Sequence, residues 1–203
     1  MDVTIRHGLP EAMIPEAARL YWEAFGGKLG RVLGPEPRAL AFLARTIRPD
    51  HSLHAIDDHG RIVGIAGFKS PEGSFAGGNG ADLRAVYGIV GGTWRAALLR
   101  HLQREVENQR FLLDGICVTR EARGQGIGTA LMEAVFEAGR ARGYQSIRLD
   151  VIDSNWRAKA LYERMGFVVL RHDRIGLIGH VFGFRGSHAM VRPLQAQGAI
   201  PQP

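Results

Sequence analysis

Apolar and polar residues alternate in several stretches of the chain, and this two-residue period is typical of half-buried strands. The first such stretch is Val3–Gly8. The stretches Ser52–Ile56 and Ile62–Phe68 are joined by Asp57-Asp58-His59-Gly60, which predicts a hairpin turn. Four further strands are predicted at Phe111–Val118, Ser146–Val151, Phe167–Arg171 and His188–Arg192.

A spacing of three and four residues between apolar positions predicts the helices. The first opens at Pro10, carries apolar residues from Ile14 to Phe25, and is expected to end at Gly26-Gly27. Seven of the twenty residues from Gly73 to Gly92 are glycine, so this stretch is expected to be less regular. The other helices are predicted at Pro35–Ile47, Thr93–Glu107, Gly126–Arg142 and Asn155–Met165, the last two stopped by Gly143 and Gly166.

Strands and helices are interspersed along the 203 residues without a linker that would separate two domains. This order predicts a single α/β or α+β domain over residues 1–194. Residues 195–203 are rich in Gln, Ala and Pro and are expected to form a flexible C-terminal tail.

Composition excludes several classes of protein. Cys117 is the only cysteine, so neither a disulfide framework nor a cysteine-based zinc site is expected. His51 and His54 have His-x-x-His spacing but no further ligand set, so they are expected to be ordinary strand-edge histidines and no metal is expected. No stretch of 18 apolar residues and no signal peptide are recognisable, and a cytoplasmic location is expected.

The chain carries 26 basic and 20 acidic residues, a formal charge of +6 with a pI near 10.1. This excess indicates an anionic partner, which could be nucleic acid, a membrane surface or a phosphorylated cofactor. The arginines are scattered and are not interleaved with aromatic residues in a stripe, which argues against nucleic acid. Neither a nucleic-acid nor a membrane partner is therefore expected.

The segment from Val118 to Thr129 carries the clearest chemical signal. A strand leads into a glycine-spaced turn in which a helix begins, and the exposed N–H groups of such a helix start favour a phosphate. The alternative is a tight strand–helix connection without a ligand. No Gly-Lys-Ser/Thr ending of a Walker loop exists, and Thr129 replaces the third glycine of a dinucleotide fingerprint. The spacing present is Arg-x-x-Gly-x-Gly, from Arg123 to Gly128.

This spacing resembles the coenzyme-binding signature Gln/Arg-x-x-Gly-x-Gly/Ala of the GCN5-related N-acetyltransferase (GNAT) family. Residues Asn155–Phe167 are similar to a second element of that family, Asn-x-x-Ala-x-x-Leu-Tyr-x-x-x-Gly-Phe. The two motifs in this order, separated by a strand, are far more specific than either alone. The resemblance covers Leu112 to Leu170, and the N-terminal half agrees with the family only in its general order of strands and helices.

The resemblance implies a central mixed β-sheet flanked by helices, with two splayed parallel strands, Phe111–Val118 and Ser146–Val151, that form a cleft for acetyl-coenzyme A (acetyl-CoA). An acceptor amine would attack the thioester directly, and Tyr162 would act as general acid toward the leaving thiolate. The residues that the resemblance assigns to the coenzyme are Ile116, Cys117 and Val118 by their backbone, Arg123, Gly124, Gln125, Gly126, Ile127, Gly128 and Thr129 at the pyrophosphate, and Asn155, Ala158 and Tyr162 on one helical face.

Several of these residues have a plainer interpretation. Asp114 interrupts an apolar strand and is either the general base or the partner of an arginine, and Glu23 is a weaker candidate for the base. Asn155 could cap its helix, and Tyr162 could be a half-buried helix tyrosine. Cys117 is expected to be a small core residue and not a nucleophile.

The predicted function is an N-acetyltransferase that uses acetyl-CoA and a small-molecule primary amine. The alternatives are acetylation of a protein N-terminus or lysine, or a non-catalytic acyl-CoA-binding sensor. Residues 69–110 form a loop–helix insertion where many relatives have a short turn. The insertion is expected to serve the acceptor pocket or an interface, such as that of a homodimer, and the alternative is a surface embellishment.

Overall fold

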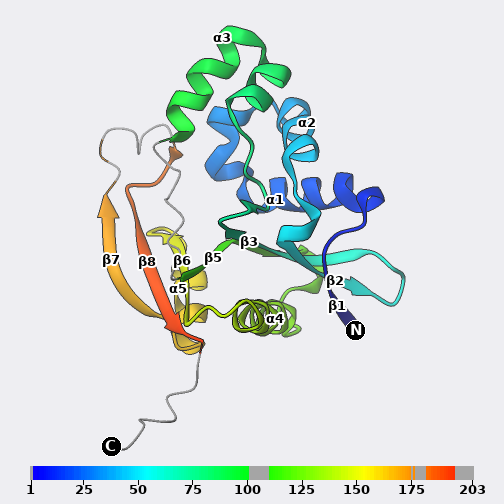
Figure 1. Ribbon diagram of the computed structural model, residues 1–203, viewed down its shortest axis with the longest axis vertical. Coiled ribbons are helices and arrows are strands. Elements are labelled where there is room, and N and C mark those ends of the chain that lie inside the picture. Colours follow the sequence, from blue (N-terminus) through cyan, green and yellow to red (C-terminus); the bar gives the residue numbers. More distant parts are fainter. Residues whose placement is uncertain (1, 101–109, 175, 177–181, 195–203) are drawn as a thin grey trace, which may run out of the picture.

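The computed structural model describes residues 2–100, 110–174, 176 and 182–194. Within these residues eight strands form one sheet with the order β1-β2-β3-β5-β6-β8-β7, and the short β4 pairs with β3 (Figure 1). All the strands predicted from the alternating pattern are present, within a few residues at their ends. They are β1 (Val3–His7), β2 (Ser52–Asp57), β3 (Ile62–Ser70), β4 (Gly73–Ser74), β5 (Arg110–Val118), β6 (Ser146–Ile152), β7 (Val168–Arg174) and β8 (Gly186–Pro193).

Helices cover both faces of the sheet (Figure 1). On one face α4 packs on β1, β2, β3 and β5, and its apolar side is fully buried in the main core. On the opposite face α1 packs on β3 and β5, and α2 and α3 are stacked beyond it. The helices are α1 (Ile14–Leu33), α2 (Glu36–Thr46), α3 (Gly80–Arg100), α4 (Ile127–Ala141) and α5 (Trp156–Arg164), with 3₁₀ turns at Glu11–Met13, Pro49–His51 and Arg120–Ala122.

The first helix does not end at Gly26-Gly27, as its sequence predicts, but continues to Leu33. Two glycines in a helix interior cost roughly 1 kcal/mol each relative to alanine. Tertiary contacts offset this cost, because Val32 and Leu33 are buried in clusters that the extra turns create. Gly26 itself packs against Trp22, whose ring would lie 3.0 Å from an added Cβ.

The glycine-rich segment is also more regular than expected, because α3 already begins at Gly80 and not at Thr93. Its chain bends sharply at Gly88, where φ is +76°, a left-handed conformation that favours glycine. The bend folds the helix back on itself, so that a Cβ on Gly92 would lie 2.5 Å from the Arg84 backbone. Residues 101–107 of the predicted helix, and the predicted tail 195–203, lie outside the described residues.

The parallel strands β5 and β6 diverge as the sequence resemblance implies. They are the one parallel pair among the described strands, and their pairing covers Arg110–Leu112 and Ser146–Arg148. Beyond these residues β5 pairs with β3 alone and β6 with β8 alone. The register of β5 on β3 shifts between Leu113 and Gly115, which makes Asp114 the extra residue of a β-bulge. A bulge bends its strand and re-aims a side chain, and here it lies where the two strands separate.

His51 and His54, expected to be ordinary strand-edge histidines, are buried, 4% and 2% exposed, and neither lies on an edge strand of the sheet. The ring Nε2 of His51 lies 3.0 Å from the Ser70 hydroxyl. His51 lies in the 3₁₀ turn before β2, with its ring centre 5.3 Å from that of Phe68, and His54 lies in β2, an interior strand between β1 and β3.

Candidate active site

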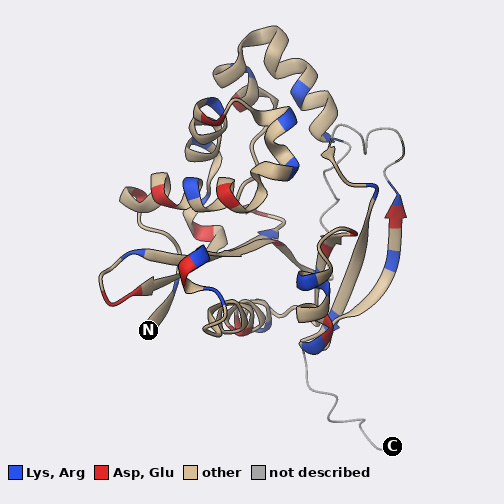
Figure 2. Cartoon of the chain, turned by 180° about the vertical axis from the view of Figure 1, so that it is seen from behind, with Lys and Arg blue, Asp and Glu red and all other residues tan. Residues whose placement is uncertain are grey.

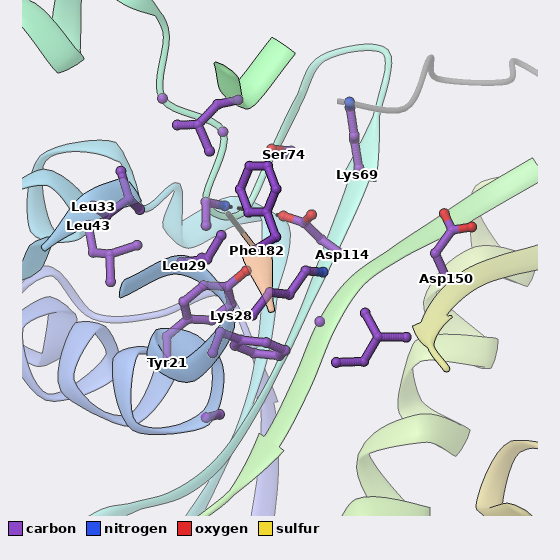
Figure 3. Close-up of a pocket in the computed structure, with 18 of the residues that line it drawn as sticks. Tyr21, Lys28, Leu29, Leu33, Leu43, Lys69, Ser74, Asp114, Asp150 and Phe182 are labelled. Carbon is purple, nitrogen blue, oxygen red and sulfur yellow. Dashed lines mark hydrogen bonds between the residues drawn. The ribbon is translucent and has the colours of Figure 1, made fainter. Parts of the chain in front are cut away.

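A cleft of about 1240 Å³ opens where β5 and β6 separate. Its walls come from α1, β5, β6, α5, the 69–110 insertion and the segment around Phe182 (Figure 3). Five of the residues singled out in the sequence line it: Asp114, Ile116, Asn155, Ala158 and Tyr162. The fold therefore brings both predicted catalytic side chains, Asp114 and Tyr162, to one cavity.

Asp114 lies on the bulge of β5, and its carboxylate Oδ2 accepts a hydrogen bond from the Ala76 N–H at 3.3 Å. Its side chain is exposed to the open cleft, and residues of several elements line that cleft around it. Desolvation by these residues raises the pKa of the Asp114 carboxyl, and it outweighs the opposite effects of the Ala76 N–H and of the Lys69 and Lys28 charges. Among the described residues, the charged groups that act on the carboxylate are thus Lys69, Lys28 and His51, and no arginine is among them, whereas an arginine was expected as the alternative to a base.

Tyr162 lies on α5 and is buried, with 8% of its surface exposed, where the sequence allowed a half-buried residue. Its ring packs beside that of Phe167, with the centroids 5.8 Å apart. Burial raises the pKa of the Tyr162 hydroxyl to about 12, so the group keeps its proton at neutral pH. A protonated hydroxyl at the wall of the cleft can act as a proton donor.

Asn155 caps α5, as one of its two predicted roles requires. Its Oδ1 accepts a hydrogen bond from the Ala158 N–H at 3.2 Å. Both residues also line the cleft. The small Ala158 leaves room between Asn155 and Tyr162 on the same helical face.

The glycine-spaced turn forms an open helix start at the carboxyl end of β5. Gly124 and Gly126 have φ of +78° and +81°, and Gly126 is the N-cap of α4 without a side chain that caps the helix. An added Cβ on either glycine would meet no protein atom within 4 Å, so the space above the turn is open. The first N–H groups of α4 have no carbonyl partner within the helix, and together with the helix dipole they suit a phosphate.

Two side chains fix this turn to the rest of the molecule. Ile127 is buried in the main core and anchors the first residue of α4. Arg123 donates a hydrogen bond from Nε to the Val118 carbonyl at 3.2 Å. Val118 and Arg123 line a second cavity of about 320 Å³ together with Glu23. Glu23 thus lies beside the turn and away from the cleft of Asp114, which disfavours it as the base.

Beyond Leu112 the edge of β5 that faces β6 has no strand partner among the described residues. The Thr119 N–H donates a hydrogen bond to the Val63 carbonyl at 2.9 Å. Because successive residues of a strand direct their backbone groups to opposite sides, this bond shows which residues of β5 face β3 and which face away from it. Cys117 therefore pairs with β3 through its backbone, while the backbone groups of Ile116 and Val118 face the opening. The Cys117 side chain is buried against α1, and burial raises the pKa of its thiol to about 12, in agreement with a core residue.

Several charged or polar residues that line the cleft were not singled out in the sequence, among them Tyr21, Lys28, Lys69 and Asp150. Lys28 lies just beyond the predicted end of the first helix, and Lys69 just beyond the predicted end of its strand. Asp150 was within a predicted strand, and the strand alternation that buries Leu149 and Val151 turns it to the cleft. Lys28 and Lys69 could have been found only with more accurate element ends.

Among the described residues no group of three or more His, Cys, Asp and Glu side chains is placed to hold a metal ion. The helices in the same part of the chain include none that is long and apolar enough to span a membrane. The basic residues are spread over several helices and strands and are not gathered on one element (Figure 2).

Known proteins resemble the chain in both sequence and structure. The model of the acetyltransferase (GNAT) family matches residues 14–167. Thialysine N-epsilon-acetyltransferase of Bos taurus is 38% identical over 60 residues, which are 30% of this chain and 35% of that protein. Probable N-acetyltransferase camello of Xenopus laevis is 37% identical over 84 residues, 41% of this chain and 34% of that protein. The chain thus matches about a third of the length of these relatives.

Two solved structures share the fold over nearly the whole chain. A GCN5-related N-acetyltransferase from Kribbella flavida has a TM-score of 0.61 at 18% identity and covers 94% of this chain and 97% of its own. A histone acetyltransferase HPA2-related acetyltransferase from Corynebacterium glutamicum has a TM-score of 0.62 at 23% identity and covers 99% of each chain. Because the family model matches most of the chain and the cleft lies where the family signature predicts it, this protein belongs to the GNAT family of acetyltransferases.

Proposed function

We propose that the protein transfers the acetyl group of acetyl-CoA to the primary amine of a small molecule by direct attack of the amine on the thioester. One observation carries this proposal: Asp114 and Tyr162 line the same cleft, which lies between two diverging strands. Membership of the family supports acetyl-CoA as the acyl donor.

The open start of α4 suits the pyrophosphate of the coenzyme. The segment Arg123–Thr129 would supply the N–H groups of the helix start and the Arg123 guanidinium. The pantetheine arm would lie along β5, where the backbone of Ile116 and Val118 faces the opening and Cys117 lies between them. On the other side Asn155, Ala158 and Tyr162 would border it.

The acceptor must lose a proton before it can attack. An alkylamine with a pKa near 10.4 is mostly protonated at neutral pH, and its deprotonation costs about 4–5 kcal/mol. Asp114 would take this proton, directly or through water. The raised pKa of its carboxyl makes it a stronger base than an ordinary aspartate.

The chemical step forms a bond between the amine nitrogen and the acetyl carbon and breaks the bond from that carbon to sulfur. Tyr162 would donate its hydroxyl proton to the departing sulfur, the attacking nitrogen would release its second proton to solvent, and Tyr162 would regain a proton from solvent. Its buried and protonated hydroxyl supports this role. Cys117 takes no part, because its thiol is buried and protonated.

A small acceptor is favoured over a protein segment by the walls of the cleft. The insertion supplies Ser74, Gly78 and Leu83 to one wall, and Phe182 closes in from the C-terminal segment. These residues line the side of the cleft that lies away from the coenzyme turn, which supports a role of residues 69–110 in the acceptor pocket.

The test is a panel of small amines and peptides, with release of coenzyme A thiol as the readout. Thiol release with small amines and not with peptides supports the proposal, whereas the reverse result would establish the protein acetyltransferase alternative. If coenzyme A raises the melting temperature and no amine or peptide releases thiol, the protein is a sensor and the proposal is wrong.

A further inference from the structure

Tyr21 of α1 lines the cleft and is buried, with 7% of its surface exposed. In the close-up its hydroxyl points into the cleft, toward the side on which Asp114 lies (Figure 3). Within the part of the chain that the structure describes, this hydroxyl has no hydrogen-bond partner. Buried polar groups are nearly always hydrogen-bonded, so a buried hydroxyl that faces a cleft without a partner indicates a partner on the ligand.

Packing holds the Tyr21 ring in place. Its centroid lies 4.5 Å from that of Phe25 and 5.6 Å from that of Phe75, which is fully buried. A Cβ on Gly115 would lie 2.8 Å from the Phe25 ring and 3.4 Å from the Tyr21 ring, so both rings lie directly on β5 beside the bulge. A hydroxyl on a fixed ring loses little conformational freedom when it binds a ligand.

The Tyr21 hydroxyl shares this part of the cleft with the Asp114 carboxylate. Gly115, on which the Tyr21 ring packs, directly follows Asp114 in the chain. Burial raises the pKa of the Tyr21 hydroxyl well above its usual range, and the negative charge of Asp114 raises it further. The hydroxyl therefore keeps its proton, and its oxygen is a neutral hydrogen-bond acceptor beside the proposed base.

The nitrogen of a primary amine needs two such groups. The attacking nitrogen carries two N–H bonds, and one of them can donate to the Asp114 carboxyl group while the other needs a second acceptor. The nitrogen gains positive charge as it attacks, and a charged nitrogen makes the stronger hydrogen bond. A contact that is stronger in the transition state than in the bound substrate raises kcat more than it lowers KM.

We propose that Tyr21 is a further catalytic residue, whose hydroxyl oxygen accepts a hydrogen bond from the second N–H of the acceptor nitrogen and so directs the nitrogen lone pair at the thioester. This inference rests on the proposed function and deepens it, because it names a group that selects a primary amine. A secondary amine has one N–H fewer and leaves either Asp114 or Tyr21 without its partner. Tyr21 keeps its own proton throughout the reaction.

The first experiment compares amines that differ only at the nitrogen. Butylamine, benzylamine and phenethylamine are each tested against their N-methyl derivatives, with thiol release as the readout. We expect kcat/KM to be at least about tenfold higher for the primary amine of each pair, because the N-methyl group replaces one hydrogen bond. Equal values within the pairs would overturn the inference and leave the proposed function intact. Thiol release from none of the amines would overturn both.

The second experiment removes the hydroxyl alone. Tyr21→Phe keeps the ring that packs on Phe25 and Phe75, and the melting temperature should not fall. We expect kcat for the primary amines to fall about tenfold with little change in KM, and kcat for the N-methyl amines to change little, so that the preference within each pair is lost.

Tyr144→Phe is the matched control for this variant. It also removes a tyrosine hydroxyl, and its ring packs on Phe111 with the centroids 5.2 Å apart, but Tyr144 is not among the described residues that line the cleft. If Tyr21→Phe behaves like Tyr144→Phe, or slows the primary and the N-methyl amines equally, Tyr21 does not bind the acceptor nitrogen.

Discussion

The two places where we propose that the coenzyme and the acceptor bind, called the coenzyme end and the acceptor end, differ in how they are built. The coenzyme end is a local structure, in which a single segment from β5 through the turn to α4 supplies the backbone groups that face a phosphate. The acceptor end is assembled from α1, α2, β3, the insertion and the C-terminal segment. The first can be recognised as a motif because its geometry depends on neighbours in sequence. The second has no motif, because its residues are neighbours only in the folded chain.

The largest effect is expected from Gly126→Val at the coenzyme end. Gly126 has φ of +81°, and a β-branched residue in this conformation costs about 1–3 kcal/mol, so the turn should rearrange. We expect coenzyme A no longer to raise the melting temperature. Gly128→Ala is the control, because its Cβ would meet only Val118, at 3.8 Å. Unchanged stabilisation of Gly126→Val by coenzyme A would show that the turn does not bind the pyrophosphate.

The next largest effect concerns the chemistry between the two ends. Tyr162→Phe removes the proton donor and leaves the packing of the ring on Phe167 in place. Turnover should fall by about a hundredfold or more, as expected for the loss of a general acid. The shift in melting temperature with coenzyme A should stay the same. Wild-type turnover in this variant would remove Tyr162 from the mechanism.

Asp114→Asn tests the base at the border of the acceptor end. We expect kcat/KM to fall by about a hundredfold. In the wild type kcat/KM should rise with pH through the pKa of Asp114, and this limb should be lost in the variant. An unchanged pH profile would show that another group takes the proton.

The same variant has an expected sign for stability. Burial raises the pKa of the Asp114 carboxyl, so the folded state favours its neutral form. The stability from this preference is present at low pH and is lost as pH rises through the folded pKa. At neutral pH the asparagine variant should therefore be at least as stable as the wild type. A lower melting temperature at pH 7 would mean that the carboxylate and the two lysines stabilise the fold, and loss of activity could then reflect loss of structure.

The smallest effect is expected in α1, which carries Lys28 to the acceptor end. Gly27 has no atom within 4 Å of an added Cβ and lies inside the helix. Gly27→Ala should raise the free energy of unfolding by roughly 0.5–1 kcal/mol, measured by urea denaturation. Gly26→Ala should gain less, because its Cβ would lie 3.0 Å from the Trp22 ring. An equal gain at both positions would show that the contact with Trp22 does not limit the helix there.

Much of the fold could be predicted because apolar residues recur with a period of two in the strands and of about 3.6 in α2, α4 and α5. The errors are at Gly26-Gly27 and in the glycine-rich segment before Thr93. In both places local propensity predicts a helix end or an irregular stretch. The chain is helical there because the helix buries apolar side chains, namely Val32, Leu33, Leu83 and Tyr87. Because of those errors, the sequence did not predict that Lys28 lies in α1 or that the insertion forms a wall of the cleft.

The sequence by itself determined the family, the open start of α4 and the two side chains proposed for proton transfer, because these features depend on spacing within short segments. Only the tertiary structure decided that Asp114 lies on a bulge where β5 leaves β6, that Glu23 faces a different cavity, and that Lys28 and Lys69 lie beside Asp114. The reason is physical. Hydrogen bonds and φ angles of a turn are set by adjacent residues, whereas the charge and shape of the acceptor end depend on contacts between segments that the sequence does not place side by side.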